Sequence, residues 1–180
     1  NDVFPKDYEA FFAGRPVEYL KKGVDALKAG VYLDLASLEL AVIPFFEPNN
    51  YPDSKRFWMY DPMPTVTNRV KDEPVSKPAN AELALRAYRD IIGFDSSFYF
   101  YKGYYRQPSM TPDSLSAPSR ITSSYPELLV YGASAQRGVA SGVASVEAGY
   151  YASEDDTSGT NPFVPNSEIK FLGGYQRQLA

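Results

Sequence analysis

Two residue types are missing from the chain, cysteine and histidine. Without cysteine there is neither a disulfide framework nor a thiolate metal site. Without histidine, the side chain that most often serves as a general base is absent too. We therefore expect no enzyme activity and no cofactor.

Long apolar runs and an excess of basic residues are missing as well. No stretch reaches the roughly 18 consecutive apolar residues that a membrane-spanning helix needs. The chain has 18 Lys and Arg against 22 Asp and Glu, a formal net charge of -4. No basic stripe is available to neutralise phosphates, so we expect no nucleic-acid partner.

Two short motifs come close to known sites and miss them. Ser134 lies in a small-residue stretch, 132–136, but this stretch lacks the final glycine of a nucleophile elbow and the chain has no histidine to pair with it. The acidic stretch 154–161 offers oxygen ligands around a glycine but lacks the ligand spacing of an EF-hand loop. We therefore expect neither a catalytic residue nor a metal site.

What the chain does contain is aromatic residues, 15 Tyr and 11 Phe against a single Trp. Membrane-spanning β-barrels place such residues in girdles at both membrane interfaces. A Tyr-rich soluble β-sandwich would have a similar composition, so the aromatic content alone leaves both classes open.

The stretch 27–46 has the period-two pattern of paired strands. Odd positions from Leu27 to Leu35 are apolar, while the even positions are mixed and partly polar. Ala36 and Ser37 leave room only for a tight reversal, and 38–42 alternates again. The pattern predicts a hairpin whose second strand leads into a long polar loop.

Similar patterns recur along the chain and predict a meander. We expect seven strands, at 27–35, 38–42, 81–87, 97–105, 127–136, 143–153 and 168–179. Short reversals are expected near Ala36, Gly93 and Arg137. Long loops are expected at 47–78, 107–126 and 154–166, and the N-terminal residues 1–24 are expected to form a further loop.

This alternation of short and long connections predicts the fold class. Short turns at one end of the strands and long loops at the other are typical of outer-membrane barrels. We therefore predict an all-β protein, an antiparallel up-and-down meander of a transmembrane β-barrel with about seven or eight strands visible. It would be a single domain covering residues 1–180 and a partial chain, because the last strand reaches Leu179 and Ala180.

Three short stretches carry a resemblance to a known group. They are Asn1–Phe4 with Asp7 and Tyr8, then 43–48 at the end of a strand, and 164–168 at the start of the last strand. On these stretches the chain resembles porin-like outer-membrane β-barrel proteins of Gram-negative bacteria, of the alginate-export and phosphate-selective porin types. The resemblance implies a passive channel in the bacterial outer membrane, and it transfers no substrate-binding residue. The chain departs from a whole family member in having too few strands for a wide barrel and no terminal aromatic residue.

The alternation also predicts which side chains would line a pore. The candidates are Lys28, Tyr32, Asp34, Glu39, Glu82, Arg86, Tyr99, Tyr101, Glu147, Lys170 and Gln176. In a water-filled barrel, facing acids and bases create a transverse field that selects among solutes. The same residues could instead be ion pairs that brace a partly plugged barrel. Their mixed signs predict no preference for anions or cations.

Three functional hypotheses follow from these observations. The first is an outer-membrane channel for passive passage of small polar solutes, with lipid as its surroundings. The second is a soluble secreted β-sandwich that binds carbohydrate through its Tyr-rich face. The third is a barrel that scaffolds a partner protein. A homo-oligomer is compatible with the first.

Overall fold

The computed structural model describes residues 23–49, 61 and 63–178, and these form an all-β structure. A large sheet has seven strands in the order β1-β2-β4-β5-β8-β9-β10, and a small sheet has the order β3-β7-β6. The strands of the large sheet are β1 (Leu27–Tyr32), β2 (Ser37–Ile43), β4 (Glu82–Ile91), β5 (Phe94–Tyr104), β8 (Glu127–Val139), β9 (Gly142–Ser153) and β10 (Glu168–Arg177). Those of the small sheet are β3 (Asn68–Asp72), β6 (Ser109–Pro112) and β7 (Arg120–Ser124), and a short 3-10 helix, η2, covers Pro78–Asn80.

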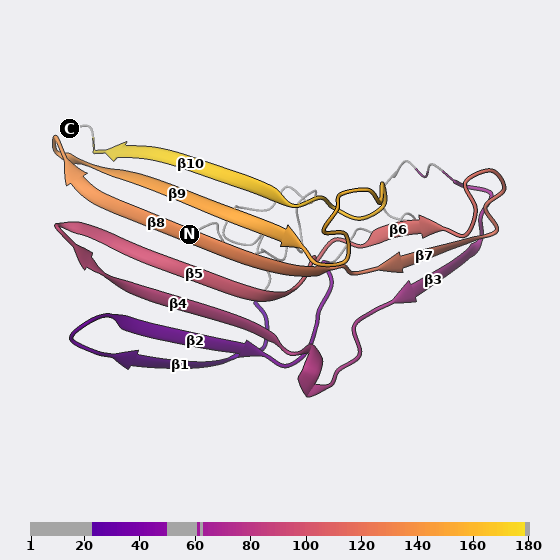
Figure 1. Ribbon diagram of the computed structural model, residues 1–180, viewed down its shortest axis with the longest axis horizontal. Coiled ribbons are helices and arrows are strands. Elements are labelled where there is room, and N and C mark those ends of the chain that lie inside the picture. The colour runs from indigo at the N-terminus through magenta and orange to yellow at the C-terminus, as the bar shows by residue number, and fades with distance from the viewer. Residues whose placement is uncertain (1–22, 50–60, 62, 179–180) are drawn as a thin grey trace.

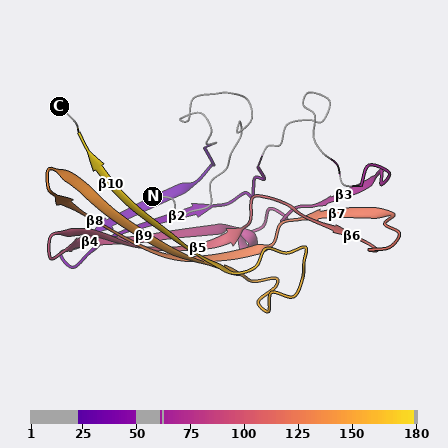
Figure 2. The same ribbon diagram turned by 90° about the horizontal axis from the view of Figure 1, so that it is seen from above.

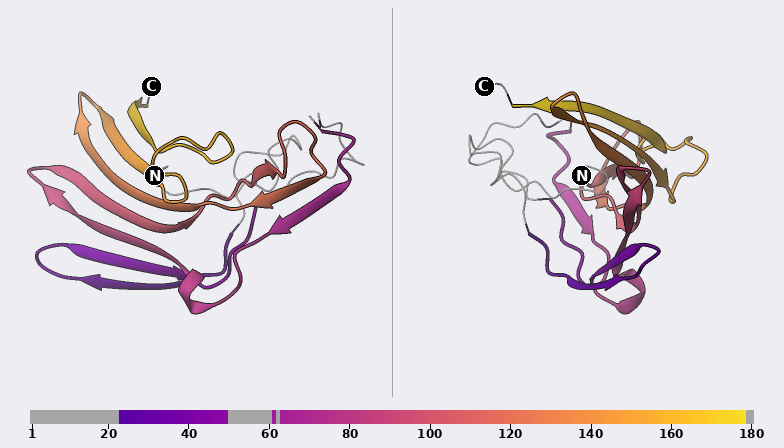
Figure 3. Two further views of the ribbon diagram at one scale, coloured as in Figure 1. Left: turned by 45° about the vertical axis from the view of Figure 1, so that its right-hand side comes forward. Right: turned by 90° about the vertical axis from the view of Figure 1, so that its left-hand side faces the viewer.

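The large sheet is an antiparallel meander, as predicted, because each strand pairs with the next one of that sheet along the chain. Figure 1 shows the strands lying side by side, and Figures 2 and 3 show that the sheet is curved. Among the described residues, β1 and β10 pair on one side only, so the sheet is open there. The expected all-β meander is confirmed, and no closed barrel is present in the described part of the chain.

Short turns join the strands at one end of the large sheet, which we call the turn end (Figure 1). Ile92 and Gly93 join β4 to β5, and Ala140 and Ser141 join β8 to β9. All four residues have positive φ, which gives the turn a twist that matches the twist of the flanking strands. The long connections lie at the opposite end, the loop end, next to the small sheet.

The predicted strand ends differ from the structure where the turns form. The first strand stops at Tyr32 because residues 33–36 form the turn, in which Leu33 N donates to the Ala36 carbonyl at 3.3 Å. The reversal predicted near Arg137 lies further along the chain, because Gly138 still pairs with Val143 in the sheet.

Two of the predicted long loops are partly regular. The stretch 47–78 contains β3, and the stretch 107–126 contains β6 and β7. The strand β3 is entirely exposed and has no apolar alternation that the sequence could have revealed. Its pairing with β7 is parallel, which brings together segments distant in the sequence.

The two faces of the large sheet differ in chemistry. We call one the apolar face. Its large apolar side chains include Leu27, Val31, Leu38, Leu40, Leu85, Ile91, Phe94, Phe98, Phe100, Tyr131, Val139, Val146, Tyr150, Ile169, Phe171 and Tyr175. The other, the polar face, carries most of the charged residues together with Tyr99, Tyr101 and Tyr151.

Burial is inverted relative to a water-soluble sheet. Phe171 on the apolar face is 80% exposed, whereas Val130 on the polar face is fully buried. Among the exposed large hydrophobic residues of these strands, only Tyr32, Val143 and Leu172 lie on the polar face.

The small buried core also lies on the polar face. It consists of Tyr99, Tyr101, Leu128, Val130 and Tyr151. In the described part of the chain, no helix is long and apolar enough to cross a membrane.

Candidate functional site on the polar face

Residues that pair with one another in neighbouring strands form a row across the polar face. Glu39 pairs with Arg86, and Arg86 pairs with Tyr99. The row then passes through Gly132 and Gly149 and reaches Lys170. Period-two alternation therefore places residues from six strands on one line.

Charged side chains form a chain of contacts along the first strands of this row. Lys28 Nζ lies 2.8 Å from Glu39 Oε1, and Arg86 Nη1 lies 3.6 Å from Glu39 Oε2. Arg86 also donates from Nη2 to Ser97 Oγ at 3.0 Å, and its guanidinium lies 4.4 Å from the ring centroid of Tyr88. Both bases thus share one acid, and the group of three keeps one net positive charge.

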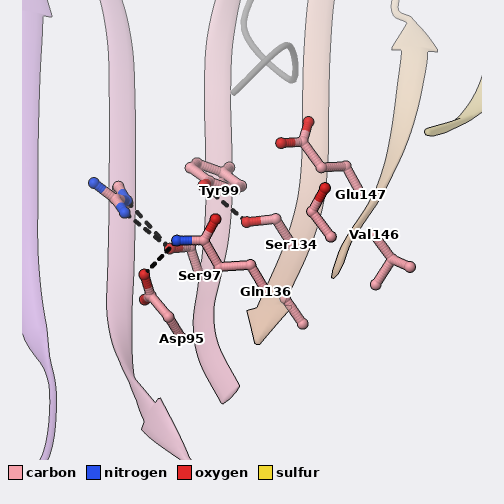
Figure 4. A pocket seen from close by; sticks show the side chains of 10 residues that line it. Asp95, Ser97, Tyr99, Ser134, Gln136, Val146 and Glu147 are labelled. Atoms are coloured by element: carbon pink, nitrogen blue, oxygen red, sulfur yellow. Dashed lines mark hydrogen bonds between the residues drawn. The ribbon is translucent and has the colours of Figure 1, made fainter. Parts of the chain in front are cut away.

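A polar pocket continues this chain between β4, β5, β8 and β9. Figure 4 shows its side chains, with Tyr99 Oη 3.0 Å from Ser134 Oγ and Gln136 Nε2 donating to Asp95 Oδ2 at 2.9 Å. Its lining residues are Arg86, Asp95, Ser97, Tyr99, Ser134, Ala135, Gln136, Ser145, Val146 and Glu147. Most of these residues carry hydrogen-bonding groups, so the lining of the pocket is polar.

A buried ion pair lies at the loop end of the polar face. Arg106 Nη2 lies 2.5 Å from Glu82 Oε2, and the two side chains are 6% and 0% exposed. Tyr101 donates its hydroxyl to the same oxygen at 3.0 Å. A buried carboxylate needs such partners, because an unpaired charge away from water is very costly.

Arg106 also ties the connection after β2 to the large sheet. Its Nη1 donates to the Glu47 carbonyl at 2.7 Å, and its own carbonyl accepts from Asn49 N at 3.1 Å. The guanidinium carbon of Arg106 lies 5.2 Å from the ring centroid of Phe46, and that centroid lies 4.8 Å from the ring centroid of Tyr125. The connection is therefore anchored across the loop end of the polar face.

Turns near the loop end are held by carboxylates. Asp156 accepts backbone hydrogen bonds from Asn161 at 2.6 Å and from Thr160 at 3.2 Å. These bonds lower the pKa of Asp156 below its ordinary value.

Burial raises the pKa of Tyr105, beside the buried core, to about 12.

The predicted pore-lining residues share one face of the large sheet, with Asp34 as the exception. Ten of them lie on the polar face of the large sheet: Lys28, Tyr32, Glu39, Glu82, Arg86, Tyr99, Tyr101, Glu147, Lys170 and Gln176. Asp34 lies in the turn between β1 and β2 instead. Direct contacts join Lys28, Glu39 and Arg86 in one group and Glu82 with Tyr101 in another.

Sequence reasoning missed several polar-face residues. Asp95 and Gln136 pair directly with each other across β5 and β8, but Asp95 falls in a predicted turn and Gln136 at a predicted strand end. Extending the period-two pattern of Tyr99 backwards would have found Asp95 and Ser97. No sequence signal points to Arg106, because it lies beyond the end of β5 and its partner Glu82 lies 24 residues earlier, on β4.

Comparison of the chain with models of known protein families, with curated proteins and with solved structures finds no match.

Proposed function

We propose that this chain forms part of the wall of a β-barrel channel in the bacterial outer membrane, through which small polar solutes pass passively. The apolar face would contact lipid and the polar face would enclose water. The observation that carries the proposal is the inverted burial of the two faces.

The exposed apolar face supports a lipid environment. Phe98, Tyr131 and Phe171, from three different strands, are 58%, 49% and 80% exposed. A continuous apolar surface of this kind is rare on monomeric proteins in water and marks contact with a membrane or partner. The polar groups on the opposite face would then not meet hydrocarbon.

Strand length and the position of charges support the same surroundings. The strands β4 and β10 each have 10 residues, within the roughly 9–11 that cross a bilayer when tilted. On the apolar face, Lys102 lies towards the loop end, and Arg137 lies towards the turn end. Long basic side chains at such positions reach the polar interface, a behaviour known as snorkelling.

The polar face supports passage of small polar solutes. Its charges are of both signs, and Lys28 and Arg86 both contact Glu39 at close range. Facing charges and hydroxyl groups replace part of the hydration of a passing solute. Small polar solutes without a strict charge requirement fit this surface.

Site-directed spin labelling tests which face meets lipid. Because the chain has no cysteine, single variants carry unique labels: F98C and F171C for the apolar face, S134C and S145C for the polar face. In liposomes, we expect the first pair to be accessible to oxygen and the second pair to a water-soluble nickel chelate. Equal water accessibility of both faces, with the chain monodisperse without detergent, would rule out the lipid contact.

Planar bilayers test passage itself. We expect stepwise ion conductance when the protein is added from detergent, and a changed ion preference of the Glu39→Gln variant would show that the current flows along this face. Insertion without conductance would leave a membrane barrel that is not a channel.

The carbohydrate-binding alternative depends on accessible tyrosine rings. Tyr99 and Tyr101 are only 4% and 3% exposed, and Tyr151 is 8% exposed. Rings that are covered in this way cannot stack on a sugar, whereas the exposed rings of Tyr131 and Tyr175 lie on the apolar face, which our proposal assigns to lipid.

A further inference from the structure

A cavity of about 200 Å³ lies on the polar face where β9 pairs with β10. Its lining centres on Gly149, because Glu147 and Tyr151 are the next residues of β9 on the same face and Lys170 is its partner on β10. The side chain of Lys170 is 56% exposed and Leu172 is 53% exposed. A solute on the polar face can therefore reach this cavity.

Part of the cavity wall is apolar, although it lies on the polar face. Leu172 and the largely buried ring of Tyr151 form two sides of it. Between them Gly149 has no side chain, and a Cβ atom there would lie only 3.2 Å from Tyr151 Cε2. An apolar site of about 150 Å³ is large enough to hold a benzene ring. This cavity can thus take an apolar group of several carbon atoms.

An acid and a base line the same cavity without pairing with each other. Glu147 and Lys170 are diagonal neighbours in the register, with Cα atoms about 7–8 Å apart. Instead of turning to Glu147, Lys170 places its Nζ 2.8 Å from Glu168 Oε1 and 4.3 Å from the ring centroid of Tyr151. Glu168 and Tyr151 form the next pair of this face, on the side away from Glu147. The cavity therefore lies between two opposite charges.

This arrangement of charges restricts the chemistry of a ligand. A ligand with only a negative charge would face Glu147, and one with only a positive charge would face Lys170. A ligand with both charges can donate to the carboxylate and accept from the ammonium. The ammonium has three donors, and its exposed ion pair with Glu168 is of a weak kind. A second carboxylate can therefore share it.

We propose that this cavity binds a small zwitterionic solute with an apolar side chain, of the class of the free apolar α-amino acids. The ligand carboxylate accepts hydrogen bonds from Lys170, and the ligand ammonium donates to Glu147. Its side chain lies against Leu172 and the ring of Tyr151. The inference rests on the proposed function and deepens it, because it names a class of solute for the polar face.

Ligand titrations test whether both charges are needed. The probe is L-leucine, added to the full ¹⁵N-labelled chain in detergent micelles while amide chemical shifts are followed by NMR. We expect saturable shifts centred on residues 147–151 and 169–172. Leucinamide lacks the carboxylate and 4-methylpentanoate lacks the ammonium, so each should bind at least about tenfold more weakly than leucine. Glycine, which lacks the apolar side chain, should also bind more weakly.

Substitutions test whether the ligand lies in this cavity. Lys170→Gln and Glu147→Gln should each weaken leucine binding at least about tenfold. Lys102→Gln is the matched control, since it removes the same charge from the apolar face and should leave binding unchanged. Three results would overturn the proposal: no saturable shift at these amides, equal affinity for leucine and either singly charged analogue, or equal effects of Lys170→Gln and Lys102→Gln.

Leucine binding and the proposed channel can fail separately, because binding in micelles needs neither a bilayer nor a current. Normal conductance without leucine binding would refute the amino-acid site alone. Leucine binding by a chain that fails the lipid-contact test would refute the channel alone.

Discussion

The ring of Tyr101 lies across Gly103 on the polar face of β5, so close that a side chain at position 103 would collide with it. Tyr101 is only 3% exposed and belongs to the buried core of the polar face. The glycine therefore provides the space in which a core ring packs, and the two residues work as a pair.

Replacing this glycine should destabilise the sheet. We expect Gly103→Val to lower the free energy of unfolding by about 1–3 kcal/mol, because an overpacked ring must leave its place. Gly173→Val is the matched control, since no atom lies within 4 Å of the corresponding position. Urea titration in detergent measures both variants, and equal effects at the two positions would contradict the pairing of Tyr101 with Gly103.

The buried ion pair at the loop end should be the most sensitive contact to single substitution. Arg106→Met leaves Glu82, which is 0% exposed, without its cation, and we expect a loss of about 3–5 kcal/mol in the free energy of unfolding. Adding Glu82→Gln to this variant should recover part of the loss, because the uncompensated charge is then gone.

The exposed Arg120 provides the control for this experiment. Arg120→Met should change the free energy of unfolding by no more than about 0.5 kcal/mol. If the Arg106 and Arg120 variants behaved alike, the ion pair would have no structural importance.

The turn between β6 and β7 should open in acid. Asp113 accepts hydrogen bonds from Ser119 N at 2.9 Å and from Arg120 N at 3.1 Å. Hydrogen bonds from Ser119 and Arg120 hold the pKa of Asp113 at about 2, below its ordinary value of 3.8. The charged form is thus favoured in the folded state.

The sign of the pH effect follows from this lowered pKa. The stabilisation is fully present above pH 3.8 and is lost as the pH falls towards 2. We expect amide exchange in β6 and β7 to speed up over this range, and Asp113→Asn to abolish that pH dependence. A variant that kept the same acid transition would contradict the assignment to Asp113.

Neutralising Glu39 should change the ion preference of the proposed channel. Glu39 faces both Lys28 and Arg86, so Glu39→Gln leaves two bases uncompensated on the polar face. We expect the reversal potential in a salt gradient to shift towards anion preference. The control is Glu73→Gln, which changes the same charge outside the seven strands. An identical shift in both variants would mean that the polar face does not line the current path.

A charge in the middle of the apolar face should impair folding into a bilayer. Tyr131 lies between Phe100 and Tyr150, and Tyr131→Arg should cost about 2–4 kcal/mol if that row lies near the bilayer midplane. Ser96→Arg is the control, because Ser96 lies on the same face beside Arg89 near the turn end. Folding into liposomes, followed by gel mobility against urea, measures both. A smaller cost for Tyr131→Arg than for Ser96→Arg would contradict the proposed depth.

Much of the large sheet could be predicted from the sequence because period-two alternation is a local property. The alternation places Tyr99 and Tyr101 on one face of their strand, and the register puts both on the polar face. The positions of the turns were less predictable. Ala140 and Ser141 adopt positive φ although neither is glycine, so no local signal marks them.

The sequence by itself determined the alternation, and with it the strands and the side-chain chemistry of each face, because neighbouring residues in a strand point to opposite sides. Only the tertiary structure decided which distant groups meet. Glu82 and Arg106 form a buried ion pair, and β3 pairs with β7. Both contacts join segments that are far apart in the sequence, so no local pattern specifies them. The exposure of the apolar face is likewise a tertiary property, since it depends on which side of the sheet the rest of the chain covers.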